Sequence, residues 1–195
     1  MKKLVLATSN KHKIVEINNI MKGFELLSLK DIGFEEDIEE TGSTLPENSQ
    51  IKALAVLNYC KQKGLNYPVI ADDSGLFVNA LNGEPGVNSA RYAGDHNDEA
   101  NRQKVLKGLQ GKLDRTAYYE CVICYASEDE TKFFSGKTHG KITTEKIGDE
   151  SFCYDCLFYS DDLQKVFGEA SKEEKDSVSH RGRAVQKLVQ WLNEK

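Results

Sequence analysis

Apolar residues fall into short runs and helical repeats that alternate along the chain. Residues 3–8 form a short apolar run that predicts a buried strand. Residues 14–21 then repeat isoleucine and methionine at helical spacing, which predicts a helix that ends at Gly23. Residues 24–29 predict a second strand. A strand, a loop and a helix in this order are typical of α/β proteins.

A second helix is predicted to begin after Thr44 and to end at Gly64. The Thr44 side chain caps the first turn, Glu47 bonds back to the cap, and Pro46 suits the first turn. The acidic stretch 31–43 before this helix has no regular pattern.

A polar segment, Asp72-Asp73-Ser74-Gly75, separates two short apolar strands at 69–71 and 76–78. We therefore expect the two aspartates at a strand end, in a place typical of functional sites.

The rest of the chain predicts a mixture of strands and helices. The same patterns indicate a helix at 97–110, strands at 115–127, 131–146 and 154–159, and a helix at 178–193. Parallel strand–helix pieces early in the chain and antiparallel pieces later predict an α/β fold with a mixed sheet.

Length and composition limit the number of domains and the kinds of partner that this chain can have. The chain has 195 residues, with 26 basic and 31 acidic ones, so its formal net charge is −5. This length predicts one domain over residues 1–195, in which two lobes share a core without a linker. No apolar run approaches the roughly 20 residues of a membrane span. The mild acidity also argues against nucleic acid and anionic membranes as partners.

The cysteines suggest a cellular location and an alternative site. Five cysteines are an odd number, and no export signal is visible, so we expect a cytoplasmic protein. Cys121-x-x-Cys124 and Cys153-x-x-Cys156 have the spacing of a four-cysteine zinc site. However, Cys121 and Cys124 lie at an odd offset in a predicted strand and should point to opposite faces. Buried cysteines are therefore the favoured interpretation, and a zinc module is a third alternative.

Residues 8–13 join the first strand to the first helix and could bind phosphate. Backbone amides at a helix start point toward such a loop, and the helix dipole favours an anion there. The hydroxyls of Thr8 and Ser9, the Asn10 amide and the Lys13 ammonium would complete a phosphate cradle. The alternative is an ordinary capped helix with solvated lysines.

Two acidic segments, Glu39-Glu40-Thr41-Gly42 and Asp72-Asp73-Ser74-Gly75, could bind Mg²⁺. This ion prefers one or two carboxylates together with waters and substrate phosphates. A carboxylate beside the ion can also deprotonate a water. The alternative is an aspartate that caps a turn. Near the last helix, Lys175, His180 and Arg181 would form a second site for an anion or a base edge.

Five motifs in this order resemble the inosine triphosphate pyrophosphatase family, the XTP/dITP diphosphatases, over nearly the whole chain. They are Thr8-x-Asn10-x-x-Lys13, Glu39-Glu40-Thr41-Gly42, Ala71-Asp72-Asp73-Ser74-Gly75-Leu76, Gly86-x-x-Ser89-Ala90-Arg91-Tyr92 and Ser179-His180-Arg181-Gly182. The resemblance implies an α/β fold of two lobes around a long, twisted mixed sheet, with the active-site cleft between them. It also implies a homodimer that cleaves the deaminated purine nucleotides ITP, dITP and XTP to a monophosphate and pyrophosphate, cleansing the nucleotide pool.

The resemblance also implies a role for each matching residue. Asp73 would be the general base and would hold Mg²⁺ together with Glu39, and Ser74 would contact the substrate. Lys175 would bind substrate, and His180 and Arg181 would meet its base edge or phosphate. The triphosphate would be held by the whole loop, Thr8, Ser9, Asn10, Lys11, His12 and Lys13.

The base pocket is the place where this sequence departs from the family. The family's Phe-Gly-Tyr-Asp-Pro stretch appears here as Phe152-Cys153-Tyr154-Asp155-Cys156. By this resemblance Phe152 should stack on the purine and Asp155 should read its edge, while Cys153 and Tyr154 should also contact the substrate. The two cysteines leave open a nucleotide pyrophosphatase with another base preference. A protein that binds nucleotides without hydrolysing them is a further alternative.

Overall fold

The strands form a mixed sheet in the order β2-β1-β3-β5-β6-β7-β8, and β4 pairs with β3. This computed structural model describes residues 2–94, 97–149 and 152–195. The strands are β1 (Lys2–Leu6), β2 (Phe24–Ser28), β3 (Val69–Val78), β4 (Pro85–Gly86), β5 (Thr116–Ala126), β6 (Thr131–Ile142), β7 (Phe158–Ser160) and β8 (Lys165–Val166). The α-helices are α1 (Lys11–Ile20), α2 (Leu45–Gln62), α3 (Asp98–Gly108), α4 (Lys172–Val178) and α5 (His180–Asn193). The predicted α/β fold with a mixed sheet is confirmed.

The chain forms two compact units. The first comprises Met1–Asp73, Cys121–Gly136 and Arg181–Lys195, and the second comprises Ser74–Glu120 and Lys137–His180.

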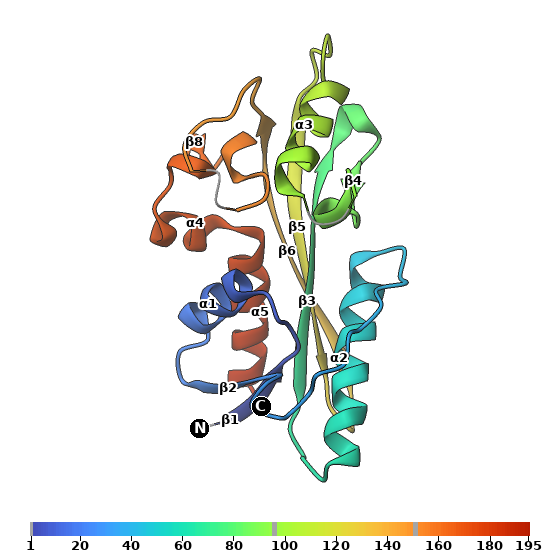
Figure 1. Cartoon of the computed structure of the whole chain (residues 1–195). Helices are drawn as coiled ribbons and strands as arrows, with labels where there is room; N and C mark the ends of the chain where they lie inside the picture. The colour runs from blue at the N-terminus through green and yellow to red at the C-terminus, as the bar shows by residue number, and fades with distance from the viewer. Residues whose placement is uncertain (1, 95–96, 150–151) are drawn as a thin grey trace. The chain divides into compact units, whose positions relative to one another are not determined.

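In the first unit, β1 pairs in parallel with both β2 and β3. Helices α1 and α5 cover one face of these strands, and α2 covers the other (Figure 1). Side chains alternate along a strand, so Leu6 and Ile70 pack with α1 and α5, while Val5 and Val69 pack with α2. Side chains on the part of β3 that belongs to the first unit, Val69–Asp73, therefore alternate between the face of α1 and α5 and the face of α2.

The second unit has a core rich in aromatic residues. Tyr119 of β5 packs there with Tyr154, Phe158 and Phe167, and α3 contributes Val105. These side chains are almost completely buried. The aromatic core supports the turn that carries the predicted base-pocket residues.

The prediction that Asp72 and Asp73 lie at a strand end is wrong. Strand β3 runs without a break from Val69 to Val78, with the polar segment inside it. Gly75 makes this possible, because β4 pairs with β3 there and a Cβ on Gly75 would overlap the carbonyl oxygen of Gly86. The two carboxylates therefore project from the middle of a strand.

Two further predictions also need correction. Residues 154–159 were expected as a strand, but Asp155–Leu157 form a 3₁₀ turn and only Phe158–Ser160 pair as β7. Residues 172–178, where no helix was predicted, form the separate helix α4. Its start is fixed because the Ser171 hydroxyl accepts a hydrogen bond from the Glu174 amide at 3.2 Å.

Candidate functional site

The loop after β1 is organised by Asn10. Its side-chain oxygen accepts hydrogen bonds from the amides of His12 at 3.0 Å and Lys13 at 3.3 Å, which caps α1. The Asn10 amide in turn donates to the Thr8 hydroxyl at 3.2 Å. Ser9 is exposed, as are Lys11 and His12. The loop thus has the predicted form of a capped helix start, and its role in holding a triphosphate stays a prediction.

Asp72 and Asp73 are neighbours on β3 and point to opposite faces of the sheet. Asp72 lies on the side of α1 and α5, and Asp73 lies on the side of α2. The Asp72 carboxylate is 3.0 Å from the Lys13 ammonium and 3.2 Å from the Arg181 guanidinium. The Asp73 carboxylate is 3.4 Å from the Lys52 ammonium. Two adjacent acids therefore have different partners.

The Asp72 carboxylate is completely buried, and its pKa shows how its cations compensate. Burial alone would raise this pKa, but the charges of Lys13, Arg181 and Lys52 outweigh burial and hold it well below the ordinary value. Arg181 also pairs with Glu16 and is itself almost fully buried. Asp72 is therefore ionised in the folded protein at neutral pH and fixes the positions of its cations.

Asp73 has the opposite electrostatic balance. Burial raises the pKa of its carboxyl, and the charges of Lys52 and Lys13 offset only part of that effect. Its second oxygen, Oδ2, is buried and has no hydrogen-bond partner among the described residues. A buried carboxylate oxygen without a partner costs free energy, which a ligand, a metal ion or a water molecule can recover. Asp73 thus combines a raised pKa with an oxygen that is free to accept a ligand.

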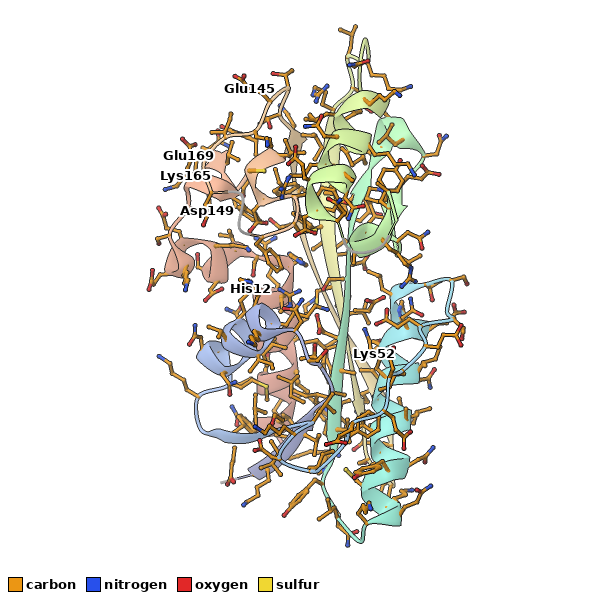
Figure 2. All side chains as sticks on the ribbon, in the orientation of Figure 1. His12, Lys52, Glu145, Asp149, Lys165 and Glu169 are labelled. Atoms are coloured by element: carbon orange, nitrogen blue, oxygen red, sulfur yellow. The ribbon has the colours of Figure 1, made fainter. Side chains whose placement is uncertain are left out.

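Lys52 is a functional candidate that the sequence analysis missed. Its ammonium lies 3.0 Å from the Glu40 carboxylate and 3.4 Å from that of Asp73, and its side chain is 11% exposed. Figure 2 labels it on α2. The signal was present in the sequence, because Asn48 and Lys52 follow each other at helical spacing on the otherwise apolar face of α2.

The acidic loop before α2 brings Glu40, rather than Glu39, to this cluster. Glu40 is half-buried and paired with Lys52, whereas Glu39 is exposed. The Asn48 side chain anchors the loop by accepting a hydrogen bond from the Gly42 amide at 2.8 Å. The assignment of Glu39 to a metal ion stays a prediction, and Glu40 becomes a second candidate.

The described residues hold no group of three or more histidines, cysteines, aspartates or glutamates close enough to bind a metal ion by themselves. Mg²⁺ does not need such a group, since one or two carboxylates suffice when substrate phosphates and water complete its shell. The unpartnered Oδ2 of Asp73 is a hard oxygen of the required kind. The residues around Asp73 therefore fit Mg²⁺ bound together with a phosphate.

In the second unit, Lys175 connects the predicted base-pocket residues. Its ammonium lies 2.5 Å from the Asp155 carboxylate and 4.4 Å from the centre of the Phe152 ring. Both charged side chains are about nine-tenths buried, with 12% of Lys175 and 9% of Asp155 exposed. The aromatic face of Phe152, the acceptor Asp155 and the donor Lys175 thus lie together. Such a set of side chains is suited to binding a nucleobase.

The rest of this turn is held by backbone contacts. Cys153 has a φ of +41°, a conformation that favours glycine, and its carbonyl accepts a hydrogen bond from Arg102 at 2.7 Å. Burial raises the pKa of the Cys153 thiol to about 12, so it is not a nucleophile at neutral pH. Tyr154 is fully buried, and its hydroxyl donates to the Ser89 carbonyl at 2.7 Å. The predicted substrate contacts of Cys153 and Tyr154 stay predictions.

His180 and Arg181 are consecutive but have different surroundings. The His180 ring stacks on Tyr119 with centroids 4.7 Å apart, whereas Arg181 pairs with Asp72 and Glu16. Arg181 thus has a structural role that the sequence did not predict. Ser74 is half-buried on β3, and its contact with substrate stays a prediction.

The four cysteines of the zinc alternative lie in three separate clusters. Cys121 packs in the core under α1 and α5, and Cys124 packs in the core under α2, which confirms that they point to opposite faces. Cys153 and Cys156 belong to the aromatic core of the second unit. None of the five cysteines forms a disulfide bond in the structure.

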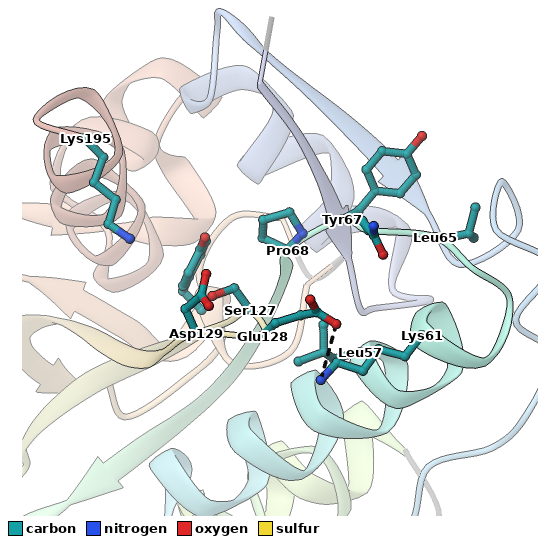
Figure 3. Close-up of a pocket in the computed structure, with 11 residues that line it drawn as sticks. Leu57, Lys61, Leu65, Tyr67, Pro68, Ser127, Glu128, Asp129 and Lys195 are labelled. Atoms are coloured by element: carbon teal, nitrogen blue, oxygen red, sulfur yellow. Dashed lines mark ion pairs between the residues drawn. The ribbon is translucent and has the colours of Figure 1, made fainter.

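The first unit also contains a pocket (Figure 3). Its wall comes from the end of α2, the segment before β3, the turn after β5 and Lys195, and it includes none of the predicted site residues that the structure describes. Lys61 and Glu128 pair across it at 3.6 Å.

Among the described residues, no helix has both the length and the apolar character needed to cross a membrane.

The mixed sheet and its helices define an α/β protein. Two neighbouring aspartates on β3 pair with lysine and arginine side chains, which are charged groups suited to a site for phosphates. The chain belongs to the Ham1 family, whose model matches residues 4–191. A dITP/XTP pyrophosphatase of Clostridium perfringens is 45% identical to it over 96% of each chain. A second one, from Thermoanaerobacter pseudethanolicus, is 44% identical over 97% of this chain and 96% of its own. The solved structure of the Staphylococcus aureus Ham1 protein covers both chains completely, with a TM-score of 0.88 and 43% identity.

Proposed function

We propose that this protein hydrolyses deaminated purine nucleoside triphosphates, dITP, ITP and XTP, to the monophosphate and pyrophosphate. The activity named for the relatives supports the substrate class. The observation that carries the proposal in this chain is Asp73, a buried carboxylate with a raised pKa and an unpartnered oxygen.

In this proposal Asp73 is the general base, which accepts a proton from the attacking water at Oδ2. Lys52 contacts the other oxygen, and its charge offsets part of the rise that burial causes in the pKa of Asp73. Mg²⁺, when bound, would neutralise charge on the phosphates, and Asp73 with Glu39 or Glu40 would hold it. Asp72 does not take part in proton transfer, because its cations keep it ionised and occupied.

The residues around Asp155 would bind the base. The Phe152 ring would stack on the purine, while Asp155 and Lys175 would bond to its polar edge. A site that bonds to an oxo group leaves buried partners unpaired when it is offered an amino group, so ATP and dATP would be poor substrates. The departures at Cys153 and Cys156 make a different base preference the alternative.

The proposal is tested by replacing Asp73 with asparagine, which keeps the shape and removes the base. We expect pyrophosphate release from dITP to fall by about a thousandfold, since general bases contribute roughly 10²–10⁴. Asp129→Asn, at an exposed position in the turn between β5 and β6, is the matched control. Turnover close to wild type in Asp73→Asn would contradict the role of Asp73.

Substrate choice and metal dependence need a second assay. Pyrophosphate release from dITP, XTP, dATP, dGTP and dUTP is measured with Mg²⁺ and again after chelation. We expect activity on dITP and XTP only, and only with the metal ion. A preference for another nucleotide supports the alternative base preference, and bound triphosphate that stays uncleaved supports a non-hydrolysing protein.

We propose also that the protein is a cytoplasmic homodimer. The free state of all five cysteines is what a reducing compartment favours. Light scattering of the purified protein tests the dimer directly.

A further inference from the structure

Tyr119 carries a buried polar group that no described residue satisfies. The side chain lies on β5 with 5% of the residue exposed, and its hydroxyl has no hydrogen-bond partner in the described part of the chain. Its ring is well packed, stacked on His180 at 4.7 Å and tilted against Phe158 at 4.8 Å. A phenylalanine would make the same ring contacts without an unsatisfied hydroxyl. A buried hydroxyl without a partner costs free energy in the ligand-free fold, which a ligand or a water molecule can recover.

The surroundings of this hydroxyl make it a donor. Burial raises the pKa of Tyr119 well above its ordinary value, and the nearby Asp155 carboxylate adds to the effect. A raised pKa keeps the hydroxyl protonated at neutral pH, so it can donate a hydrogen bond. Asp155 is the same carboxylate that pairs with Lys175, whose ammonium lies over the Phe152 ring. Tyr119 also stacks on Phe167 with ring centroids 6.4 Å apart, and the Lys175 ammonium lies 5.9 Å from the centre of that Phe167 ring. Tyr119 therefore packs against the residue cluster that the proposed function uses for the base.

We propose that the Tyr119 hydroxyl donates a hydrogen bond to an oxo oxygen of the substrate base and thereby helps to select oxopurines. The inference rests on the proposed function of the Asp155 cluster. An oxo group accepts the hydroxyl proton and removes the buried defect. An amino group at the same place donates, so the phenolic proton would be left facing the aromatic wall of Phe158 and Phe167 without an acceptor.

The test is Tyr119→Phe, which removes one oxygen atom and keeps the ring. We expect kcat/KM for dITP to fall by about tenfold and that for dATP to stay the same, because one hydrogen bond to the base is lost. We expect the melting temperature of the ligand-free protein to stay the same or rise. Tyr118→Phe is the matched control, since Tyr118 is the next residue on β5 and stacks on Phe77 instead.

Two results would overturn the inference. A lower melting temperature with an unchanged dITP to dATP ratio means that the hydroxyl serves the fold, for example through an internal water. An equal loss on both nucleotides means that it does not read the base.

Binding measurements separate this inference from the proposed function. Calorimetry with dIMP needs no hydrolysis, so about tenfold weaker binding by Tyr119→Phe is expected even from a protein that cleaves nothing. Pyrophosphate has no base and should bind to both proteins equally well. Unchanged dIMP binding would contradict the inference, whatever the enzyme hydrolyses.

Discussion

Two neighbouring aspartates show how strongly position decides the chemistry of a residue. Asp72 and Asp73 are buried on the same strand, one residue apart, yet the pKa of Asp72 is lowered and that of Asp73 is raised. Strand geometry sends the first to Lys13 and Arg181 and the second to Lys52. Two close cations outweigh the burial of Asp72, whereas Asp73 keeps part of its desolvation penalty. Their separation into a structural acid and a reactive one follows from this difference.

The lowered pKa of Asp72 predicts a pH-dependent contribution to stability. Since the folded pKa lies below the ordinary value of 3.8, the contribution is complete above that pH and is lost as the pH falls. We expect Asp72→Asn to be less stable than wild type by about 3 kcal/mol at pH 7, because Lys13 and Arg181 lose the charge of a buried carboxylate. Below pH 4 this difference should shrink by about 1.4 kcal/mol per pH unit.

Urea unfolding of both proteins between pH 7 and pH 3 measures this difference. Asp129→Asn, at an exposed position, should match wild type at each pH. A difference between Asp72→Asn and wild type that does not change with pH would contradict the lowered pKa.

At the scale of elements, the ends of the helices depend on residues close by in the sequence, whereas the polar middle of β3 depends on residues from distant segments. The capping box of α2 is present as predicted, with the Glu47 amide 3.3 Å from the Thr44 hydroxyl. Asn97 caps α3 by accepting from the Ala100 amide at 3.0 Å. Strand β3, by contrast, continues through Asp72-Asp73-Ser74-Gly75, where cations from other elements pair with the two aspartates and β4 pairs beside Gly75.

The close pairing of β3 with β4 predicts that Gly75 cannot be replaced. In Gly75→Ala the new Cβ would overlap the Gly86 carbonyl, which is backbone and cannot rotate away. We expect a loss of about 3 kcal/mol in the free energy of unfolding. Gly108→Ala is the control in the same unit, because its Cβ would meet only the flexible Leu81 side chain at 3.0 Å. Equal stability of the two variants in chemical denaturation would show that the strands separate easily.

At the scale of the whole molecule, the net charge of −5 hides how unevenly the charges are placed. Lys13, Lys52 and Arg181 are gathered around buried carboxylates, so an anion that approaches Asp73 meets cations as well as a negative charge. A divalent cation bound to the Asp73 carboxylate would replace the repulsion between this carboxylate and the anion by an attraction. A mildly acidic protein can therefore bind a short polyanion when the metal ion comes with it.

This balance predicts that pyrophosphate stabilises the folded molecule only together with Mg²⁺. A ligand that binds the native state at a hundred times its Kd adds about 2.7 kcal/mol to stability. We expect pyrophosphate with Mg²⁺ to raise the melting temperature by several degrees, and pyrophosphate with a chelator to leave it unchanged. Mg²⁺ alone serves as the control. A full stabilisation by pyrophosphate in the presence of chelator would show that the cations suffice without the metal ion.

Much of the fold could be predicted because its signals are local. A capping residue, a helical repeat or an apolar run lies within one segment, so the helices α2 and α3 and the strands β1, β2 and β5 were predicted to within a few residues. The short turn at 155–157 and the helix α4 were missed. Their residues owe their conformation to the aromatic core and to a capping serine inside a charged stretch.

The sequence by itself determined the fold class, the helix caps and the presence of a paired acidic segment, because these depend on neighbours along the chain. The tertiary structure decided that the pKa of Asp72 is lowered and that of Asp73 raised, that Lys52 pairs with Asp73 and Arg181 with Asp72, and that the Tyr119 hydroxyl has no partner among the described residues. These facts depend on burial and on charges brought together from distant segments. Both effects act through space over a few ångströms, where sequence separation has no influence.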